Sequence, residues 1–499
     1  MKQKRKQLSP LSILMFVIVF AAIGTWIIPA GNYNTLSFND NTFKYSTDSS
    51  NIVLPFSQKT LDSLHITVSL ASFSSGTIRK PVSVPGTYHQ IAKNTQGPID
   101  ILKAPINGMM DSIDIILFLL IIGGFMNVFH ETGAMVKGLT TLSYTMKGKE
   151  AWLIIILTFL FSFAGASYGM AEEALVFYPV MVPLFLAAGY DLIVPVAVIF
   201  GGTQLGTLAS FTNPFSTIIA SHAAGINWTD GLSERLIMFV LSTALFIFYI
   251  VRYAQKVKKD PTKSLVYKID GPVISPYENI ENTTDNAPLS AKNRGLLLLF
   301  LFTFLTMIAG VVFFDWWLTE MSCLFLGVSI LIAIIHRTGE NKFIKQFIKG
   351  AEDMLAVAFI IGIARGVTIV LNDGHITDSI LYYSANLVSG MPSSIFIVSL
   401  LILFMVFTLF ISSSSGMAVL TMPIMGGLAL IVHVPGREIV NAYLFGMGIM
   451  GFMTPTGLIL PSLALVNVSI KAWWKFIYPL MIWLLVLCAI FLVIGINLK

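Results

Sequence analysis

Charged residues and cysteine are both scarce in this chain of 499 residues, and each shortage narrows what the protein can be. Asp, Glu, Lys and Arg make up 11% of the sequence, hydrophobic residues make up 55%, and the mean hydropathy is +0.80. A soluble fold cannot bury so much apolar surface, so we expect an all-α polytopic membrane protein with no large soluble domain. Cys323 and Cys488 lie inside apolar runs, which supports neither a disulfide framework nor a metal site.

The sequence also lacks motifs for nucleotide hydrolysis and for zinc-dependent hydrolysis. It contains no G-x-x-x-x-G-K-[ST] and no H-E-x-x-H, so we expect no cofactor and no ATP hydrolysis within this chain. A formal charge of +5 would favour nucleic acid as the partner of a soluble protein, but here the basic residues are sorted by loop. The expected partners are therefore the lipid bilayer and a small-molecule substrate, with no nucleic acid.

The loop charges predict the topology. Lys and Arg concentrate at residues 2–6 and 137–149, in the linker VRYAQKVKKDPTKSLVYK and in HRTGENKFIKQFIKG and SIKAWWK, which the positive-inside rule assigns to the cytoplasm. HAAGINWTDGLSE, DWWLTE and NDGHITDSILYYSANLVSGMPSS contain neither residue and are expected outside. This places the chain in the cytoplasmic membrane, with its N-terminus in the cytoplasm and its C-terminus outside. Nine crossings are expected, at about 11–30, 113–130, 192–222, 234–254, 295–314, 320–336, 355–371, 437–467 and 474–497.

Three further segments need separate treatment. The first apolar run lacks an A-x-A-like cleavage site, which favours a retained helix over a signal peptide. Residues 152–188 form two apolar arms around ASYGMAEE, and the first arm, Trp152 to Ala164, is too short to cross, which predicts a re-entrant hairpin. Residues 395–434 repeat this plan around SSSSG, although there the first arm is long enough that full crossings remain open.

The two halves of the chain resemble each other. IIGGFMNVFHETG (121–133) matches IIGIARGVTIVLNDG (360–374), SYGMA matches SSGMA, and ASFTNPF matches GFMTPTG. Pro214 lies 81 positions after Gly133, and Pro455 lies 81 positions after Gly374. The first copy enters the membrane from outside and the second from the cytoplasm, so the repeats are inverted. Inverted repeats with interrupted helices are typical of secondary transporters.

The repeat sets the domain organisation. The first inverted repeat covers 1–254 and includes an outside loop at about 31–98, where segments such as LHITVSLASF predict a few short strands. A cytoplasmic linker at 255–293 and a connecting transmembrane helix at 294–319 precede the second repeat at 320–499. Segments 99–112 and 341–354 precede the repeats at corresponding positions and are expected to be interfacial helices.

Two hairpin turns and two broken helices predict the site, because they leave backbone groups unpaired that lipid cannot satisfy but a polar substrate can. Pro214 and Pro455 interrupt their helices, and glycines and serines at the turns allow a ligand to approach the backbone closely. The alternative is that such residues only kink and pack helices. The candidate substrate-binding residues are Ser167, Gly169, Glu172, Glu173, Thr212, Asn213, Arg365, Ser413, Ser414, Ser415, Gly416, Thr454 and Thr456.

Three of these candidates carry charge inside apolar segments. One of the adjacent pair Glu172 and Glu173 is expected to attract a cationic group or the coupling proton, and the other to cap the second hairpin arm. Arg365 lies about 16 Å into its span. Two roles for Arg365 stay open: it clamps a substrate carboxylate, or it pairs with Glu172, Glu173 or Asp373.

These residues also resemble a known family. YGMAEEALVFYPVMVPL, GTLASFTNPFSTIIAS, IARGVTIVLNDGHITDSIL, SSSSGMAVLTMPIM and WWKF are similar to the YfcC-like branch of the DcuC (C4-dicarboxylate anaerobic carrier) family, within the ion transporter superfamily. The resemblance covers residues 11 to 497. It implies inverted repeats, two hairpins and an elevator mechanism, with four-carbon dicarboxylates or, as in ArcD-type antiporters, arginine and ornithine as substrates.

We therefore expect an inverted-repeat transporter with two re-entrant hairpins and two broken helices. Two acids with one arginine suit a substrate of both signs, most simply an amino acid such as arginine or ornithine. A dicarboxylate carrier, a membrane-embedded enzyme that uses Glu172 and Glu173 as acid and base, and a sensor are the alternatives, although residues 255–293 are short for a signalling domain. Na+ and H+ both stay open as the coupling ion, and a homodimer stays open as the assembly.

Overall fold

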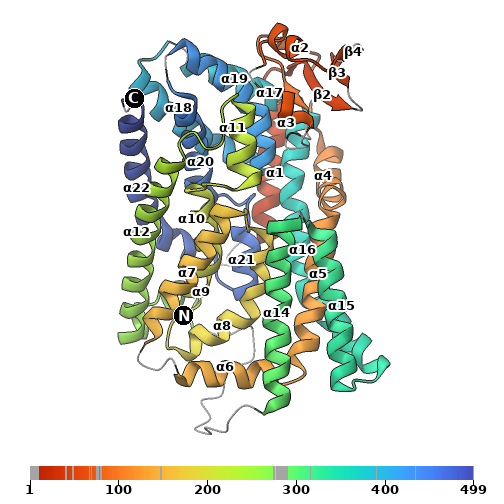
Figure 1. Cartoon of the computed structure of the whole chain (residues 1–499), viewed down its shortest axis with the longest axis vertical. Helices are drawn as coiled ribbons and strands as arrows, with labels where there is room; N and C mark the ends of the chain where they lie inside the picture. The colour runs from red at the N-terminus through yellow and green to blue at the C-terminus, as the bar shows by residue number, and fades with distance from the viewer. Residues whose placement is uncertain are drawn as a thin grey trace.

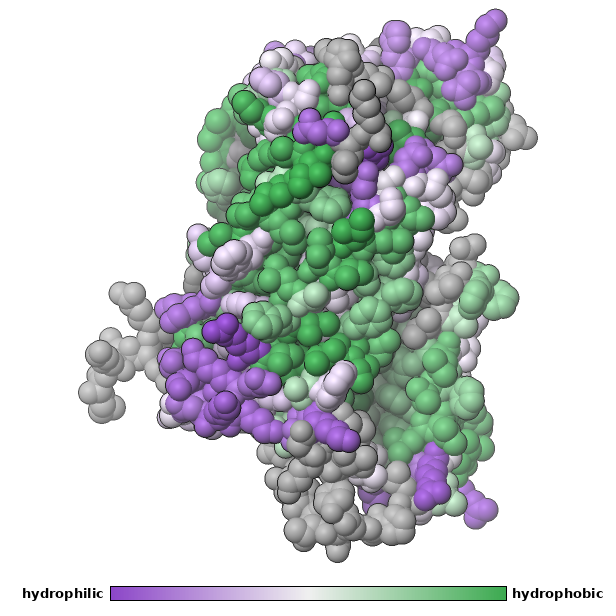
Figure 2. Space-filling view, turned by 60° about the vertical axis from the view of Figure 1, so that its left-hand side comes forward, coloured by the Kyte–Doolittle hydropathy of each residue, from purple (hydrophilic) through white to green (hydrophobic). Residues whose placement is uncertain are grey.

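The computed structural model describes the chain except residues 1–9, 40–41, 48–49, 67, 69, 75–77, 79–80, 146–148, 273–275, 277–289, 315, 389, 433 and 498–499. Within the described part, eight helices are long and apolar enough to cross a bilayer. Figure 2 shows apolar surface across the middle of the molecule, with hydrophilic residues toward its ends. The chain is a multi-pass membrane protein. The eight helices are α1 (Pro10–Ile27), α5 (Ile113–His130), α7 (Glu150–Ser167), α12 (Leu232–Lys259), α15 (Leu318–His336), α16 (Glu340–Asp373), α18 (Ser393–Phe410) and α22 (Ile470–Gly495).

The expected outside loop forms a small β subdomain, defined here as residues 31–97. Its two antiparallel sheets have the strand orders β4-β3-β2-β5 and β1-β6, which confirms the expected short strands. Leu36, Phe43 and Phe73 form its core. The subdomain lies at the same end of the molecule as the end of α22 (Figure 1). Its elements are β1 (Gly31–Asn32), β2 (Thr35–Asn39), β3 (Thr42–Ser46), β4 (Asn51–Pro55), α2 (Gln58–Ser63), α3 (Leu70–Ser74), β5 (Val82–Ser83) and β6 (His89–Gln90).

A scaffold bundle consists of α1, α4 (Pro98–Asp111), α5, α14 (Ala291–Phe314), α15 and α16. The expectation of a separate interfacial helix at 341–354 is wrong, because α16 runs without a break for 34 residues, about 51 Å. The two expected segments adjoin at residues 354 and 355, and no Pro lies near this junction that would end the helix.

The two repeats are inverted at the centre of this bundle. The α4–α5 segment belongs to the first repeat and α16 to the second. A Cβ on Gly108 would collide with the backbone of Gly362, and one on Gly123 with the backbone of Gly350. Residue numbers therefore rise along one segment while they fall along the other, so the corresponding elements are antiparallel. Small residues at both crossings let the backbones approach closely.

A hairpin bundle contains the remaining long elements. Hairpin 1 comprises α7, the 3-10 helix η1 (Glu172–Phe177) and α8 (Tyr178–Ala187), and hairpin 2 comprises α18 and α19 (Ser414–Ile431). Ser393 Oγ donates to the carbonyl of Val432 at 2.8 Å, which joins the outer ends of the two arms of hairpin 2. The α7 helix has 18 residues, more than the expected arm of Trp152 to Ala164, so its length alone does not prevent a crossing. The depth at which each hairpin turns in a bilayer stays a prediction.

Two interrupted helices accompany the hairpins. The first comprises α9 (Ile193–Val196), η2 (Ala197–Gly201), α10 (Gly202–Leu208), η3 (Pro214–Ile218) and α11 (Ile219–Ala223). The second comprises α20 (Gly436–Gly451) and α21 (Ile459–Val466). Helices α6 (Ala134–Thr145) and α17 (Thr377–Val388) occupy corresponding places in the repeats and lead from the scaffold bundle into each hairpin.

The beginning of the expected linker is folded. Helix α12 continues to Lys259, and η4 (Pro261–Lys263) and α13 (Leu265–Ile269) follow it. Asp191, before α9, accepts hydrogen bonds from Tyr253 Oη and Ser264 Oγ, both at 2.6 Å, and so fastens this segment to the hairpin bundle. Residues 277–289 of the expected linker lie outside the described residues.

Candidate functional site

The turn of hairpin 1 is hydrogen-bonded to the break in the first interrupted helix. Asn213 Nδ2 donates to the carbonyl of Gly165 at 3.0 Å, and Thr212 Oγ1 donates to the carbonyl of Ser167 at 3.0 Å. Asn213 Oδ1 accepts from the backbone N–H groups of Phe215 and Ser216, which caps η3. Gly169 has φ +85° and lies so close to Asn213 that a Cβ would collide with the Asn213 amide.

The turn of hairpin 2 has an equivalent arrangement. Thr456 Oγ1 donates to the carbonyl of Leu409 at 3.2 Å and lies 2.9 Å from Thr454 Oγ1. Ser413 Oγ accepts from the backbone N–H of Gly416, which caps the start of α19. Tyr443 Oη donates to the carbonyl of Ser414 at 2.8 Å. Ser415 follows these residues in the first turn of α19.

The two halves of the site meet. Gln204 Nε2 in α10 donates to the carbonyl of Gly448 in α20 at 3.1 Å, and Gly448 packs on Leu208. The η3 helix packs against α19. All four interruptions therefore belong to one packed cluster, as the sequence analysis expected. Gln204 and Tyr443 were missed there, because polar residues in helix interiors gave no spacing signal.

The adjacent glutamates differ in their surroundings. Glu173 is buried, and its Oε2 accepts from the backbone N–H of Ala171 at 2.9 Å, so it caps η1. Glu172 is only partly buried and interacts electrostatically with Asp114 and Arg365 of the scaffold bundle. Glu173 thus makes a capping hydrogen bond, and the expected attraction of a cationic group or the coupling proton by Glu172 stays a prediction.

Arg365 has a partner that the sequence did not suggest. Its Nε forms an ion pair with Asp111 Oδ2, whereas the sequence suggested Glu172, Glu173 or Asp373. Asp111 and Asp114 flank the junction of α4 and α5 at Ser112. The sequence offered one weak signal for Asp111, namely its place at the expected end of an interfacial helix at residue 112. That signal could not identify Asp111 as a partner of Arg365, because polar residues are common at helix ends. Asp111, Asp114, Glu172 and Glu173 thus lie with Arg365 where the turn of hairpin 1 approaches the scaffold.

The stretch GASYG, from Gly165 to Gly169, has the spacing G-x-S-x-G of a nucleophile elbow. An elbow connects a strand to a helix and exposes its serine hydroxyl. Here the stretch ends helix α7, and Ser167 Oγ donates to the carbonyl of Phe163 at 2.7 Å within that helix. The geometry is that of a helix end.

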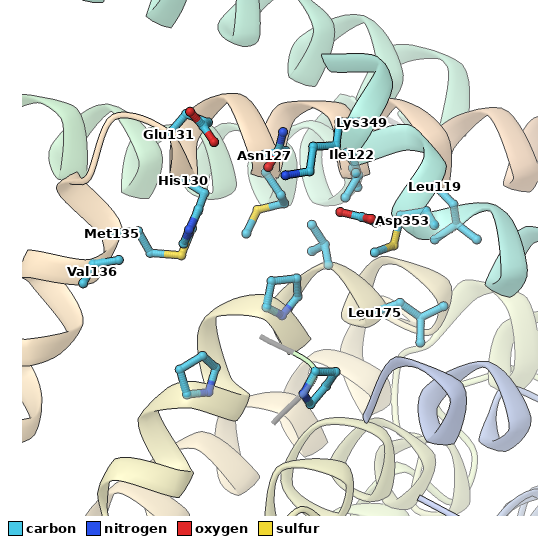
Figure 3. A pocket seen from close by; sticks show the side chains of 18 residues that line it. Leu119, Ile122, Asn127, His130, Glu131, Met135, Val136, Leu175, Lys349 and Asp353 are labelled. Atoms are coloured by element: carbon cyan, nitrogen blue, oxygen red, sulfur yellow. The ribbon is translucent and has the colours of Figure 1, made fainter. Parts of the chain in front are cut away.

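An inner cavity of about 290 Å³ lies between the scaffold and hairpin 1, away from the β subdomain. Figure 3 shows Asn127 and His130 of α5, Glu131 directly after it, and Lys349 and Asp353 of α16 around the cavity. Its remaining lining comes chiefly from apolar residues of α5, α6, α16 and hairpin 1. Charges of both signs in an apolar cavity suit a small substrate that carries both signs.

An outer cavity of about 390 Å³ lies between the scaffold, the turn of hairpin 2 and the β subdomain. Arg365, Asp378, Ser413 and Gly416 line it. Asp353 of the inner cavity and Arg365 of the outer one are 12 residues apart on α16, about 18 Å along the helix axis. The two cavities therefore lie at different levels along α16, one against hairpin 1 and the other against the turn of hairpin 2. Among the described residues no group of three or more His, Cys, Asp or Glu could hold a metal ion.

Comparisons with known proteins cover nearly the whole chain. A family model described as C4-dicarboxylate anaerobic carrier (DcuC) matches residues 9–497. An uncharacterized protein of Haemophilus influenzae is 39% identical over 491 residues, which cover 97% of this chain and 96% of that protein. A protein of Escherichia coli K12, called putative basic amino acid antiporter YfcC, is 28% identical over 485 residues, with 93% and 91% covered.

Two solved structures align with lower similarity. The YdaH transporter of Alcanivorax borkumensis is 13% identical with a TM-score of 0.40, and 98% of each chain is covered. MtrF of Neisseria gonorrhoeae, whose structure is described as illuminating a class of antimetabolite efflux pumps, is 14% identical with a TM-score of 0.39, and 99% of this chain and 96% of MtrF are covered.

Proposed function

Because the chain belongs to the C4-dicarboxylate anaerobic carrier (DcuC) family of membrane transporters, we propose that it is an antiporter for basic amino acids such as arginine and ornithine. The observation that carries this proposal is the charge where hairpin 1 meets the scaffold. Asp111, Asp114, Glu172 and Glu173 lie there with Arg365. The inner cavity between the same two parts adds Lys349, Glu131 and Asp353. An excess of acid compensates a cationic side chain and repels a second carboxylate.

The relatives support the same substrate class in part. The Escherichia coli relative is called a putative basic amino acid antiporter. The family description instead favours the second candidate, a C4-dicarboxylate. One feature on this chain favours that candidate too, since the serine-rich turn at Ser413 to Ser415 beside Arg365 resembles a site for an anion.

The proposed mechanism is an elevator. The hairpin bundle carries the substrate at its interruptions past the fixed scaffold, between the outer and the inner cavity, and α6 and α17 act as the connecting arms. In this proposal the β subdomain lies outside the cell and Na+ or H+ is the coupling ion. The inverted arrangement of the halves supports an elevator mechanism. When each half adopts the conformation of the other, an outward-open state becomes an inward-open state.

Proteoliposomes preloaded with ornithine test the substrate class. We expect uptake of radiolabelled arginine that depends on internal ornithine and is inhibited by external lysine or ornithine, while succinate and fumarate have no effect. Imposed sodium and pH gradients, applied separately, identify the coupling ion. Succinate uptake without arginine uptake would transfer the proposal to the dicarboxylate candidate.

A further inference from the structure

The β subdomain is fastened to the scaffold side of the molecule. Gly31 N donates to the carbonyl of His375 at 2.9 Å, and Tyr33 N donates to Asp378 Oδ2 at 2.9 Å. The ring of Tyr88 stacks on Tyr382 of α17, with centroids 3.9 Å apart. At the other end of the subdomain, Gln96 N donates to Thr25 Oγ1 of α1 at 2.9 Å. These contacts join the subdomain to α1, to α17 and to the loop between α16 and α17.

The same subdomain also reaches the hairpin bundle. Strand β5 packs against α19, the second arm of hairpin 2, and Val82 and Ser83 are buried. Thr35 and Ser83 line the outer cavity together with Ser413 and Gly416 of the hairpin turn. The subdomain therefore forms one wall of this cavity, and the cavity would be open on that side without it.

The outer cavity holds two charges of opposite sign that come from the scaffold side. Arg365 is paired through Nε with Asp111, and 30% of its side chain is exposed. Asp378 accepts the backbone N–H of Tyr33 through one oxygen, and the side chain of His375 lies in the same lining. An α-amino acid carries a carboxylate and an ammonium group only a few ångströms apart, so a guanidinium and a carboxylate in one cavity match its common part. A cavity of about 390 Å³ is large enough for such a molecule.

We propose that the outer cavity is a vestibular binding site for an amino acid. Arg365 holds the substrate carboxylate, Asp378 holds the α-ammonium group, and Thr35 and Ser83 of the β subdomain complete the polar wall. The site lies at the end of the molecule that carries the β subdomain. It recognises the carboxylate and the α-ammonium group, which all α-amino acids share. This inference rests on the proposed amino-acid substrate and adds a second site to it.

Side-specific kinetics test the proposal. In right-side-out vesicles that expose the β subdomain, we expect Asp378→Asn to raise the arginine KM about tenfold and Thr35→Ala to raise it about fivefold. In inverted vesicles the KM of both variants should match the wild type, because the inner cavity is unchanged. Asparagine can still accept the Tyr33 N–H, so the subdomain stays attached. Thr42→Ala is the matched control, since Thr42 lies in the same sheet but not in the outer cavity, and its hydroxyl donates to the carbonyl of Asn39 at 2.8 Å.

A thiol at the cavity gives an independent readout. Thr35→Cys is introduced with Cys323→Ser and Cys488→Ala and labelled with a membrane-impermeant methanethiosulfonate. We expect external arginine to slow the labelling in proportion to its occupancy of the cavity. An unchanged external KM in Asp378→Asn together with unprotected labelling would overturn the vestibular site, while wild-type arginine uptake would leave the proposed function intact.

The two proposals can fail separately. Absence of amino-acid uptake by the wild type would overturn the proposed function, and the labelling assay would then still decide whether the cavity binds arginine. Protection by succinate without protection by arginine would overturn the assignment of the cavity to an amino acid.

Discussion

At the scale of single residues, Glu172 and Glu173 show how neighbours acquire different tasks. Glu173 satisfies the backbone N–H of Ala171 at the start of η1, whereas Glu172 interacts electrostatically with Glu173 and, less strongly, with Asp114 and Arg365 of the scaffold. The sequence predicted one cap and one functional charge but could not assign them. The assignment depends on which carboxylate folds back on its own backbone, and that is fixed by the path of the turn after Gly169.

Glu172→Gln and Glu173→Gln should therefore have different effects. Glu172→Gln removes a charge that the proposed cationic substrate compensates, so we expect the arginine KM to rise about tenfold while thermal stability is kept. Glu173→Gln keeps an acceptor for Ala171 N but weakens the cap, so we expect a loss of stability of about 1 kcal/mol with a smaller change in KM.

Uptake kinetics in proteoliposomes and melting temperatures in detergent measure the two effects. The matched control is Glu352→Gln, which removes an exposed carboxylate of α16 that lines neither cavity. If the arginine KM rose equally in Glu172→Gln and Glu352→Gln, the rise would come from the general loss of negative charge and not from a loss of substrate binding at Glu172.

Arg365 marks the limit of residue-level prediction. Its depth in an apolar run indicated that it needed a partner, and the structure supplies Asp111, 254 positions away in the sequence. That pairing follows from the antiparallel packing of α4 on α16. No local pattern contains it, because the two residues come from different repeats.

At the scale of elements, the scaffold depends on close contact between α5 and α16. The Gly123 and Gly350 backbones touch, and no side chain fits between them. The repeat could be predicted from IIGG and IIGI and from the matching spacing of 81 positions. The continuity of α16 could not be predicted. The charged residues at its beginning are typical of an interfacial helix, and its packing against α5 was unknown.

Gly123→Ala should destabilise the scaffold by about 2 kcal/mol, because the added methyl group forces the helices apart. Gly327→Ala is the matched control: this helical glycine of α15 has open space where a Cβ would be added. We expect its stability to stay the same or to rise by up to about 1 kcal/mol, since alanine has the higher helix propensity. Melting temperatures in the same detergent measure both. Equal losses would mean that helix–helix contact at Gly123 contributes little.

At the scale of the whole molecule, the four interruptions gather in one packed cluster, and the inverted repeats explain why each half contributes one hairpin turn and one broken helix. Composition and loop charge predicted a membrane protein with related halves, and hairpin turns and prolines predicted the cluster around Asn213 and Thr454. The β subdomain's place beside the turn of hairpin 2 could not be predicted from sequence. It is set by contacts of Tyr33 and Tyr88 with α17, which lies about 290 or more positions further along the chain.

An elevator requires the hairpin bundle to move past the scaffold, and a cross-link between them tests that requirement. Leu175 of hairpin 1 and Met354 of α16 both line the inner cavity from opposite bundles. With Cys323→Ser and Cys488→Ala as background, Leu175→Cys with Met354→Cys is joined by a short bifunctional methanethiosulfonate. We expect arginine exchange to fall below about a tenth of its uncross-linked rate, since the substrate cannot be carried while the bundles are tied.

The control pair is Trp26→Cys with Lys93→Cys. Trp26 belongs to α1 of the scaffold and Lys93 to the β subdomain fastened to it, Lys93 Nζ donates to the carbonyl of Trp26 at 3.0 Å, and neither residue lines a cavity. A cross-link there joins two parts of one rigid body, so at least half of the exchange rate should remain, and reduction should restore the rate of the first pair. Full exchange by the cross-linked Leu175–Met354 pair would mean that the bundles keep their relative position during transport. The substrate would then pass between the cavities by movement of the hairpin turns alone.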